Sequence, residues 1–116
     1  MVGKASPLEF EACHSLLREL TRALEKYWID QAVYPRSGNA NLVRSLLGSH
    51  PKTQVYFQFS KGILNGRGEV IDPWGRPIVY QNRADRRLVR NVVHAPPGSF
   101  LLYSRGPEGR GRIQLG

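Results

Sequence analysis

Side chains able to do nucleophilic or metal chemistry are few in this sequence, and their spacing suits neither task. Cys13 and His14 are neighbours, but adjacent residues on a helix point about 100° apart, which prevents them from forming a nucleophile and base pair. His14, His50 and His94 fall in three separate predicted elements and have no metal-ligand spacing. We expect Cys13 to be a small buried hydrophobe and the histidines to bind no metal.

Two other kinds of active site are also absent from the sequence pattern. Nothing brings Asp30 and Asp72 together as paired carboxylates, and the capping of turns accounts for both. The glycine-rich stretches GRGEVIDPWG and RGPEGRGR lack the G-x-x-x-x-G-K-S/T order of a phosphate-binding loop, and neither stands between a strand and a helix. The sequence therefore predicts a protein that is not an enzyme and has no cofactor and no small-molecule substrate.

The chain is strongly basic, since 17 Lys and Arg against nine Asp and Glu give a formal net charge of +8. A field of this sign attracts nucleic acid, acidic polysaccharide or anionic lipid. The densest basic run is a candidate polyanion-binding site, although such a distribution is also typical of a solvated surface. It consists of Arg83, Arg86, Arg87 and Arg90.

Length and composition predict one α+β domain over residues 1–116. The lone Cys13 excludes an intramolecular disulfide and a cysteine-based metal site. No apolar run approaches the ~20 residues that a membrane span needs, so we expect the chain as shown to be soluble.

A long helix is predicted for residues 7–31. Ser6-Pro7-Leu8-Glu9 has the form of a capping box with proline at the first helical position, and Pro35 limits the helix at its other end. Apolar residues recur at steps of three and four between these limits. They are Leu8, Cys13, Leu16, Leu17, Leu20, Leu24, Tyr27 and Trp28.

A short second helix is predicted for residues 40–47, with Asn39 or Asn41 as its cap and Gly48 and Pro51 as its stop signals. The β region follows, over residues 54–115. Val55 to Phe59 alternates as a strand does, and Asn65-Gly66 is a tight-turn signal. Further strand candidates are residues 69–71, 77–81, 88–93, 100–104 and 112–115. Such strands form a small antiparallel sheet that buries one face against the long helix.

Asp72-Pro73-Trp74-Gly75 has the residue preferences of a type I turn, in which the Asp side chain accepts a bond from the backbone two residues on. Pro77 then removes an amide from the following strand. The turn does not require Trp74, so we expect its ring to cover one end of the core.

Four segments in order, ALEKYWIDQAVYP, NLVRSLL, DPWGRPIVY and FLLYSRGPEGR, resemble the globular domain of the major pseudopilins of type II secretion systems and their type IV pilin-like relatives. The resemblance runs from about Leu16 to Arg110. It rests on a helix end with a Tyr-Pro turn, an Asp-Pro-Trp-Gly-x-Pro hairpin and a Tyr-Ser-x-Gly segment. The matching residues are Ala23, Leu24, Tyr27, Asp30, Tyr34, Pro35, Asp72, Pro73, Trp74, Gly75, Pro77, Tyr103, Ser104, Gly106, Glu108 and Gly109.

This resemblance implies a pilin-like fold and a structural subunit of a pseudopilus that supports protein export. Such subunits assemble with themselves, with other pseudopilins and with inner-membrane assembly components, on the periplasmic face of the inner membrane, and a separate ATPase drives the filament. The family's processing site and apolar N-terminal helix do not precede Ser6. Either the chain shown is a fragment without the membrane helix or this relative has lost its anchor. The short Met1 to Pro7 leader favours a soluble fragment, in which the capping box at Ser6 would be fortuitous.

Members of the family often bind calcium in the C-terminal loop, a cation that requires six to eight oxygen ligands. Here Glu108 is the only carboxylate of that loop and is surrounded by Arg105, Arg110 and Arg112. Three positive charges beside one acid oppose a dication. We therefore predict that the calcium site is absent.

An alternative function is binding of DNA or another polyanion, because some pilin-like proteins bind DNA for uptake. Aromatic residues on strands, together with the basic run from Arg83 to Arg90, would provide stacking and phosphate contacts. Phe57 and Phe59 nevertheless alternate as core residues do. The aromatic residues of this alternative are Tyr56, Phe57, Phe59 and Tyr80.

Overall fold

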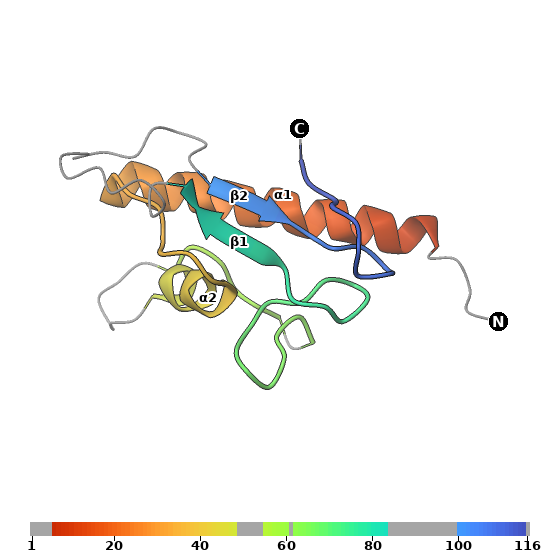
Figure 1. The fold of residues 1–116 in the computed structure, drawn as a ribbon. Coiled ribbons are helices and arrows are strands. Elements are labelled where there is room, and N and C mark those ends of the chain that lie inside the picture. Colours follow the sequence, from red (N-terminus) through yellow and green to blue (C-terminus); the bar gives the residue numbers. More distant parts are fainter. Residues whose placement is uncertain (1–5, 49–54, 61, 84–99, 116) are drawn as a thin grey trace.

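The computed structural model describes residues 6–48, 55–60, 62–83 and 100–115. Four elements follow one another along the chain: α1 (Pro7–Gln31), α2 (Asn39–Leu47), β1 (Val79–Asn82) and β2 (Phe100–Tyr103). The long helix runs the length of the molecule, with the small sheet beside it and α2 on the β1 side of that sheet (Figure 1). The predicted α+β, pilin-like layout is confirmed.

Helix α1 begins where its local sequence directs. The Ser6 side chain accepts a hydrogen bond from the amide of Glu9 (3.3 Å), and the Ser6 amide donates to Oε1 of Glu9 (2.9 Å), with Pro7 in the first turn. The helix ends at Ala32, whose φ of 62° is left-handed and whose amide donates to the carbonyl of Trp28 (2.7 Å). Its buried stripe is Cys13, Leu17, Leu20, Ala23 and Leu24.

Helix α2 has a different cap from the one expected. Its N-cap is Gly38, with φ of 108° and no side-chain cap bond, so the expectation that Asn39 or Asn41 caps it is wrong. The side chain of Asn39 is buried instead and forms hydrogen bonds with the backbone of Val70 and Ile78. Asn41 donates to the carbonyl of Ser37 (2.8 Å).

The sheet has two antiparallel strands, with Val79 opposite Tyr103 and Asn82 opposite Phe100. Single bridges extend it at Leu64–Val70, Ile71–Pro77 and Ser104–Ile113. Where strands were expected at residues 69–71 and 112–115, the structure has only isolated bridges. Pro77 has no amide, so the ladder of the 77–81 candidate begins only at Val79. The 88–93 candidate lies outside the described residues.

The strand predicted from Val55 to Phe59 is wrong, because no strand pairing forms there among the described residues. The amides of Tyr56 and Phe57 both donate to the carbonyl of Leu46 (2.8 and 3.2 Å), which fastens this segment to the end of α2. The rings of Phe57 and Phe59 lie 4.5 Å apart. Val55 is 49% exposed, and Tyr56, Phe57 and Phe59 are each partly buried, so the alternating sequence reflects neither a paired strand nor one fully buried side.

The sheet has a buried inner face and an outer face. Ile78, Tyr80 and Leu102 belong to the apolar core, together with the stripe of α1 and with Leu42 and Leu46 of α2. Side chains alternate along a strand, so Val79, Gln81, Leu101 and Tyr103 point the other way. Neither described helix combines the length and the hydropathy that crossing a bilayer would require.

Candidate structural site where the motif segments meet

The Asp72 turn has the geometry that its sequence predicts. Oδ1 of Asp72 accepts hydrogen bonds from the amides of Trp74 (3.0 Å) and Arg76 (2.9 Å), and its carbonyl accepts from the amide of Gly75 (2.9 Å). Gly75 has φ of 83°, a conformation that side-chain-bearing residues rarely adopt. Pro73 is exposed at the tip of the turn, and Asp72 itself is only 3% exposed.

A second turn of the same construction lies seven residues earlier. Oδ1 of Asn65 accepts from the amides of Arg67 (2.9 Å) and Glu69 (3.0 Å), and Gly68 has φ of 74°. The two turns differ in their surroundings, because Asn65 is half-buried and Asp72 is buried. Comparing substitutions at Asn65 and at Asp72 therefore shows how much stability the buried contacts of Asp72 add to its turn.

Ser104, from the Tyr-Ser-x-Gly segment, is bonded to the Asp72 turn. Its hydroxyl donates to Oδ2 of Asp72 (2.7 Å) and accepts from the amide of Gly106 (3.0 Å), and Ser104 is 0% exposed. Cys13 of α1 is buried beside this pair. Burial raises the pKa of the Cys13 thiol, a hydrogen bond with Ser104 lowers it, and the charge of Asp72 raises it further. The net upward shift keeps Cys13 an unreactive thiol, as expected of a buried hydrophobe.

Trp74 extends from the Asp72 turn to the beginning of α1. It is half-buried and packs against the core, and its ring meets that of Phe10 edge to face with 5.1 Å between centroids. Its Nε1 is buried and has no hydrogen-bond acceptor among the described residues. The indole therefore contributes through packing.

The Tyr-Pro turn after α1 is bonded to β1. Tyr34 is 4% exposed, and Pro35 is also buried. The hydroxyl of Tyr80 donates to the carbonyl of Pro35 (2.6 Å), and Nδ2 of Asn82 donates to the carbonyls of Tyr34 (3.1 Å) and Pro35 (3.0 Å). Buried carbonyls require such partners, so these bonds fix the path of the chain at the helix end.

Asn39 joins the start of α2 to the backbone on both sides of the Asp72 turn. Its Nδ2 donates to the carbonyls of Val70 (2.8 Å) and Ile78 (2.7 Å), and its Oδ1 accepts from the amide of Val70 (2.6 Å). Sequence reasoning identified neither Asn39 nor Asn82 as a structural link. Nothing in the residues next to them, Gly38 and Ala40 for Asn39 and Gln81 and Arg83 for Asn82, reveals a distant backbone partner.

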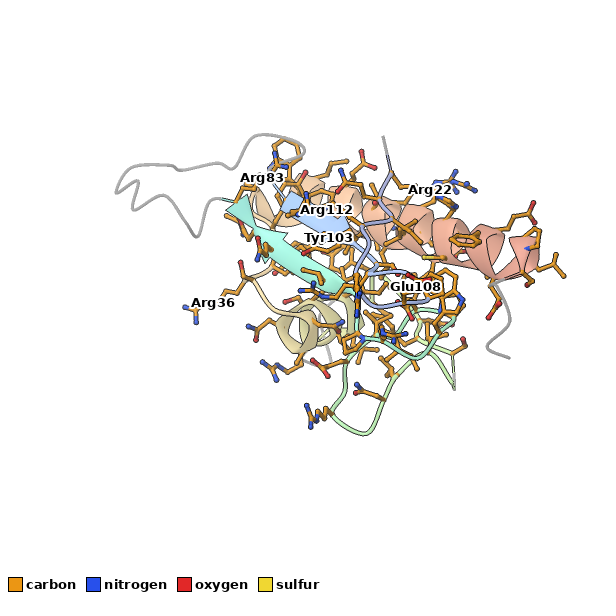
Figure 2. All side chains as sticks on the ribbon, turned by 45° about the vertical axis from the view of Figure 1, so that its right-hand side comes forward. Arg22, Arg36, Arg83, Tyr103, Glu108 and Arg112 are labelled. Carbon is orange, nitrogen blue, oxygen red and sulfur yellow. The ribbon has the colours of Figure 1, made fainter. Side chains whose placement is uncertain are left out.

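The C-terminal loop is rich in arginine contacts. The guanidinium groups of Arg112 and Arg105 lie over the ring of Tyr103, at 4.5 and 5.9 Å from its centroid. Nη1 of Arg76 donates to the carbonyl of Pro107 (2.8 Å), whereas Glu108 is exposed on the loop. Figure 2 shows Arg112 beside Tyr103 and Glu108 farther along the loop.

The candidate polyanion site is not assembled among the described residues. Arg83 is exposed and follows β1 directly, and Figure 2 shows it at the opposite end of the sheet from Glu108. Arg86, Arg87 and Arg90 lie outside the described residues. Tyr80 is 2% exposed and belongs to the core, so the expectation that it offers a stacking surface is wrong. In the described part of the chain, no three His, Cys, Asp or Glu side chains are grouped to hold a metal ion.

A long helix on a small antiparallel sheet, with the Tyr-Pro, Asp-Pro-Trp-Gly and Tyr-Ser-x-Gly segments bonded to it or to one another, defines a pilin-like domain. The family described as type II secretion system (T2SS), protein G, has a model that matches residues 1–111. The chain belongs to this family, the major pseudopilins. No curated protein and no solved structure matches the chain.

Proposed function

We propose that this domain acts as a rigid, non-catalytic subunit displayed on the periplasmic side of the inner membrane, where its pseudopilus supports protein export. Family membership supports the subunit role. The non-catalytic role is supported by the buried polar side chains that link the segments of the domain. Asp72, Ser104, Asn39 and Asn82 are all buried, and each bonds to the backbone or to another of them. Buried groups whose hydrogen bonds are made within the domain stabilise the fold and are not accessible to a substrate.

The outward side of α1 is the surface we propose for contacts with other subunits. The buried stripe occupies one side of the helix, and the opposite side carries both signs of charge along its length. Ile29, near the end of the helix, is 72% exposed. Mixed charge on a long helix suits contacts with copies of itself and with other pseudopilins. The exposed charged residues are Glu11, Arg18, Glu19, Arg22, Glu25 and Lys26.

Site-specific photocrosslinking in the source organism tests this assignment. A benzophenone amino acid replaces the exposed Ser15 on α1, and a matched probe replaces the exposed Gly66 at the tip of the Asn65 turn. We expect the Ser15 probe to give ladders of crosslinked multimers that the Gly66 probe does not. Monomers alone from the Ser15 probe would contradict a role for this face in assembly.

A second candidate function, binding of DNA or another polyanion, is favoured by the net charge of +8. Counterion release requires that such binding weaken steeply as salt rises. A salt-titrated DNA-binding assay tests it. Absence of binding at about 50 mM salt would remove this candidate, because non-specific binding is strongest at low salt.

A further inference from the structure

Tyr103 is a buried residue on the outer face of the sheet, outside the contiguous cluster of core side chains around α1. It lies opposite Val79, and its side chain points away from α1, yet only 8% of it is exposed. The guanidinium groups of Arg112 and Arg105 lie over its ring. Arginine stacks on aromatic faces with the flat side of the guanidinium, so its N–H edges stay available for hydrogen bonds.

A shallow groove of about 580 Å³ is lined in part by Arg105, which shares the ring of Tyr103 with Arg112. It follows β1 and is bounded by the start of α2 on one side and by Arg105 and Gly109 on the other. Arg76 and Glu69 also line it. Arg76 lies against the C-terminal loop, where it donates to the carbonyl of Pro107. Its side chain also packs closely on Gly109: a Cβ atom at that position would lie only 2.6 Å from Nε of Arg76.

The charges on this face are not neutralised from within the described part of the chain. Arg76, Arg105 and Arg112 contact a carbonyl or an aromatic ring there, and none of them forms an ion pair with a described carboxylate. The whole chain carries a net charge of +8. Guanidinium groups held in fixed positions lose little freedom when they bind a carboxylate with two parallel hydrogen bonds. The face is therefore preorganised for an anionic partner.

We propose that the outer face of the sheet binds an acidic, extended polypeptide segment, whose carboxylates pair with Arg105 and Arg112 while the segment lies in the groove beside β1. This partner is distinct from the subunits that α1 contacts in the filament, so the inference goes beyond the assembly role.

Two features favour a polypeptide over a single-stranded nucleic acid. Bases bind such surfaces by stacking on exposed aromatic rings, and the ring of Tyr103 is already covered by Arg112. Glu69 also lines the groove, where it would repel a continuous line of phosphates. An acidic peptide places its carboxylates at intervals and leaves neutral backbone beside Glu69.

The test is binding of a fluorescent ten-residue peptide of alternating Glu and Gly to the 116-residue chain, measured by anisotropy at about 50 mM salt. A five-nucleotide oligothymidylate with a similar number of charges is the comparison probe. The double variant R105Q/R112Q removes both ring-stacked charges. The matched control is R18Q/R22Q, which loses the same charge from two exposed positions on α1.

We expect R105Q/R112Q to weaken peptide binding about tenfold or more, as the loss of two charge-assisted pairs implies, and the control to weaken it about twofold. R105K/R112K keeps the charge but not the planar fork, and should bind with intermediate affinity. Thermal melts show whether each variant is folded.

Three results would overturn the proposal. Equal losses in the two glutamine variants would indicate a diffuse effect of net charge. Tighter binding of the oligothymidylate than of the peptide would indicate a phosphate surface. Self-association of the wild-type chain that only R105Q/R112Q abolishes, seen by sedimentation, would assign the face to a second copy.

Discussion

The hydroxyl of Ser104 donates to Oδ2 of Asp72 over 2.7 Å, and neither side chain is more than 3% exposed. One hydrogen bond thus joins two segments that are 32 residues apart in sequence. Oδ1 of the same carboxylate holds the turn from Asp72 to Arg76. The Asp side chain therefore shapes its own turn and fastens it to the end of β2.

Removing either partner of this bond should destabilise the domain. Ser104→Ala leaves a buried carboxylate oxygen and the amide of Gly106 without a partner, so we expect a loss of about 1–3 kcal/mol in the free energy of unfolding. Urea denaturation followed by circular dichroism measures it. A loss below about 0.5 kcal/mol, the usual range of surface changes, would contradict the role given to this bond.

The matched reference is the pair Asp72→Ala and Asn65→Ala. Both remove two bonds from backbone amides within a turn. Asn65→Ala also removes a part-buried bond from Nδ2 to Oε1 of Glu69 (3.0 Å), whereas Asp72→Ala removes the buried bond from Ser104. We expect the Asp72 variant to lose more stability. Equal losses would show that the contact between the segments adds nothing.

Replacing Asn39 by Asp tests the link between α2 and the hairpin. The amide nitrogen donates to two buried carbonyls, and a carboxylate oxygen in its place would face both of them. Those carbonyls should raise the pKa of the new carboxyl in the folded state. The carboxylate then destabilises the folded state above the pKa of about 4 that the group has in the unfolded chain. This loss of stability disappears as the pH falls below that pKa.

At neutral pH, Asn39→Asp should lower the free energy of unfolding more than Asn39→Ala does. We expect Asn39→Ala to lower it by about 1–3 kcal/mol, because buried backbone groups lose their hydrogen-bond partner. Denaturation midpoints at pH 7 and pH 4 measure both variants against the wild type. The deficit of Asn39→Asp relative to Asn39→Ala should shrink at the lower pH. A constant difference would contradict the bonding observed for Asn39.

Trp74→Ala should mainly destabilise, by a few kcal/mol, because the ring packs on the core and on Phe10. Trp74→Phe should recover most of this loss, since the buried Nε1 makes no hydrogen bond with a described residue that Phe would remove. Thermal melts of both variants are the measurement. If Trp74→Ala keeps its melting temperature but loses assembly, the ring is an interface residue.

Calcium should not stabilise this domain. Glu108 is the only carboxylate of the C-terminal loop, and the guanidinium of Arg76 already binds the loop carbonyl of Pro107. A dication would be repelled by Arg76 and by Arg105 and Arg112 nearby. Melting temperatures in millimolar calcium, millimolar magnesium and a chelator should agree. A clear rise in calcium alone would refute the prediction.

Elements that depend on local sequence could be predicted. The capping box at Ser6 and the apolar spacing place α1, and the Asp72 turn follows from residues within five positions of one another. Contacts between distant segments could not. Asn39 looks like a helix cap because short amide side chains favour that position, but its carbonyl partners are 31 and 39 residues away.

The same limit explains the missing strand and much of the site. The alternation from Val55 to Phe59 favours a strand, but the amides of Tyr56 and Phe57 bond to the carbonyl of Leu46 at the end of α2, a distant contact that local sequence does not reveal. Motif resemblance gave the identity of Asp72 and Ser104 but no distance between them. The stacking of Arg112 on Tyr103 likewise requires knowing that Ile113 pairs with Ser104.

We propose that type II secretion in the source organism depends on this chain as a structural subunit. Deleting its gene in the source organism and measuring a type II secretion substrate in the medium tests this directly. We predict that the substrate accumulates in the cell envelope and that the wild-type gene restores its release. Unchanged release from the deletion strain would contradict the claim.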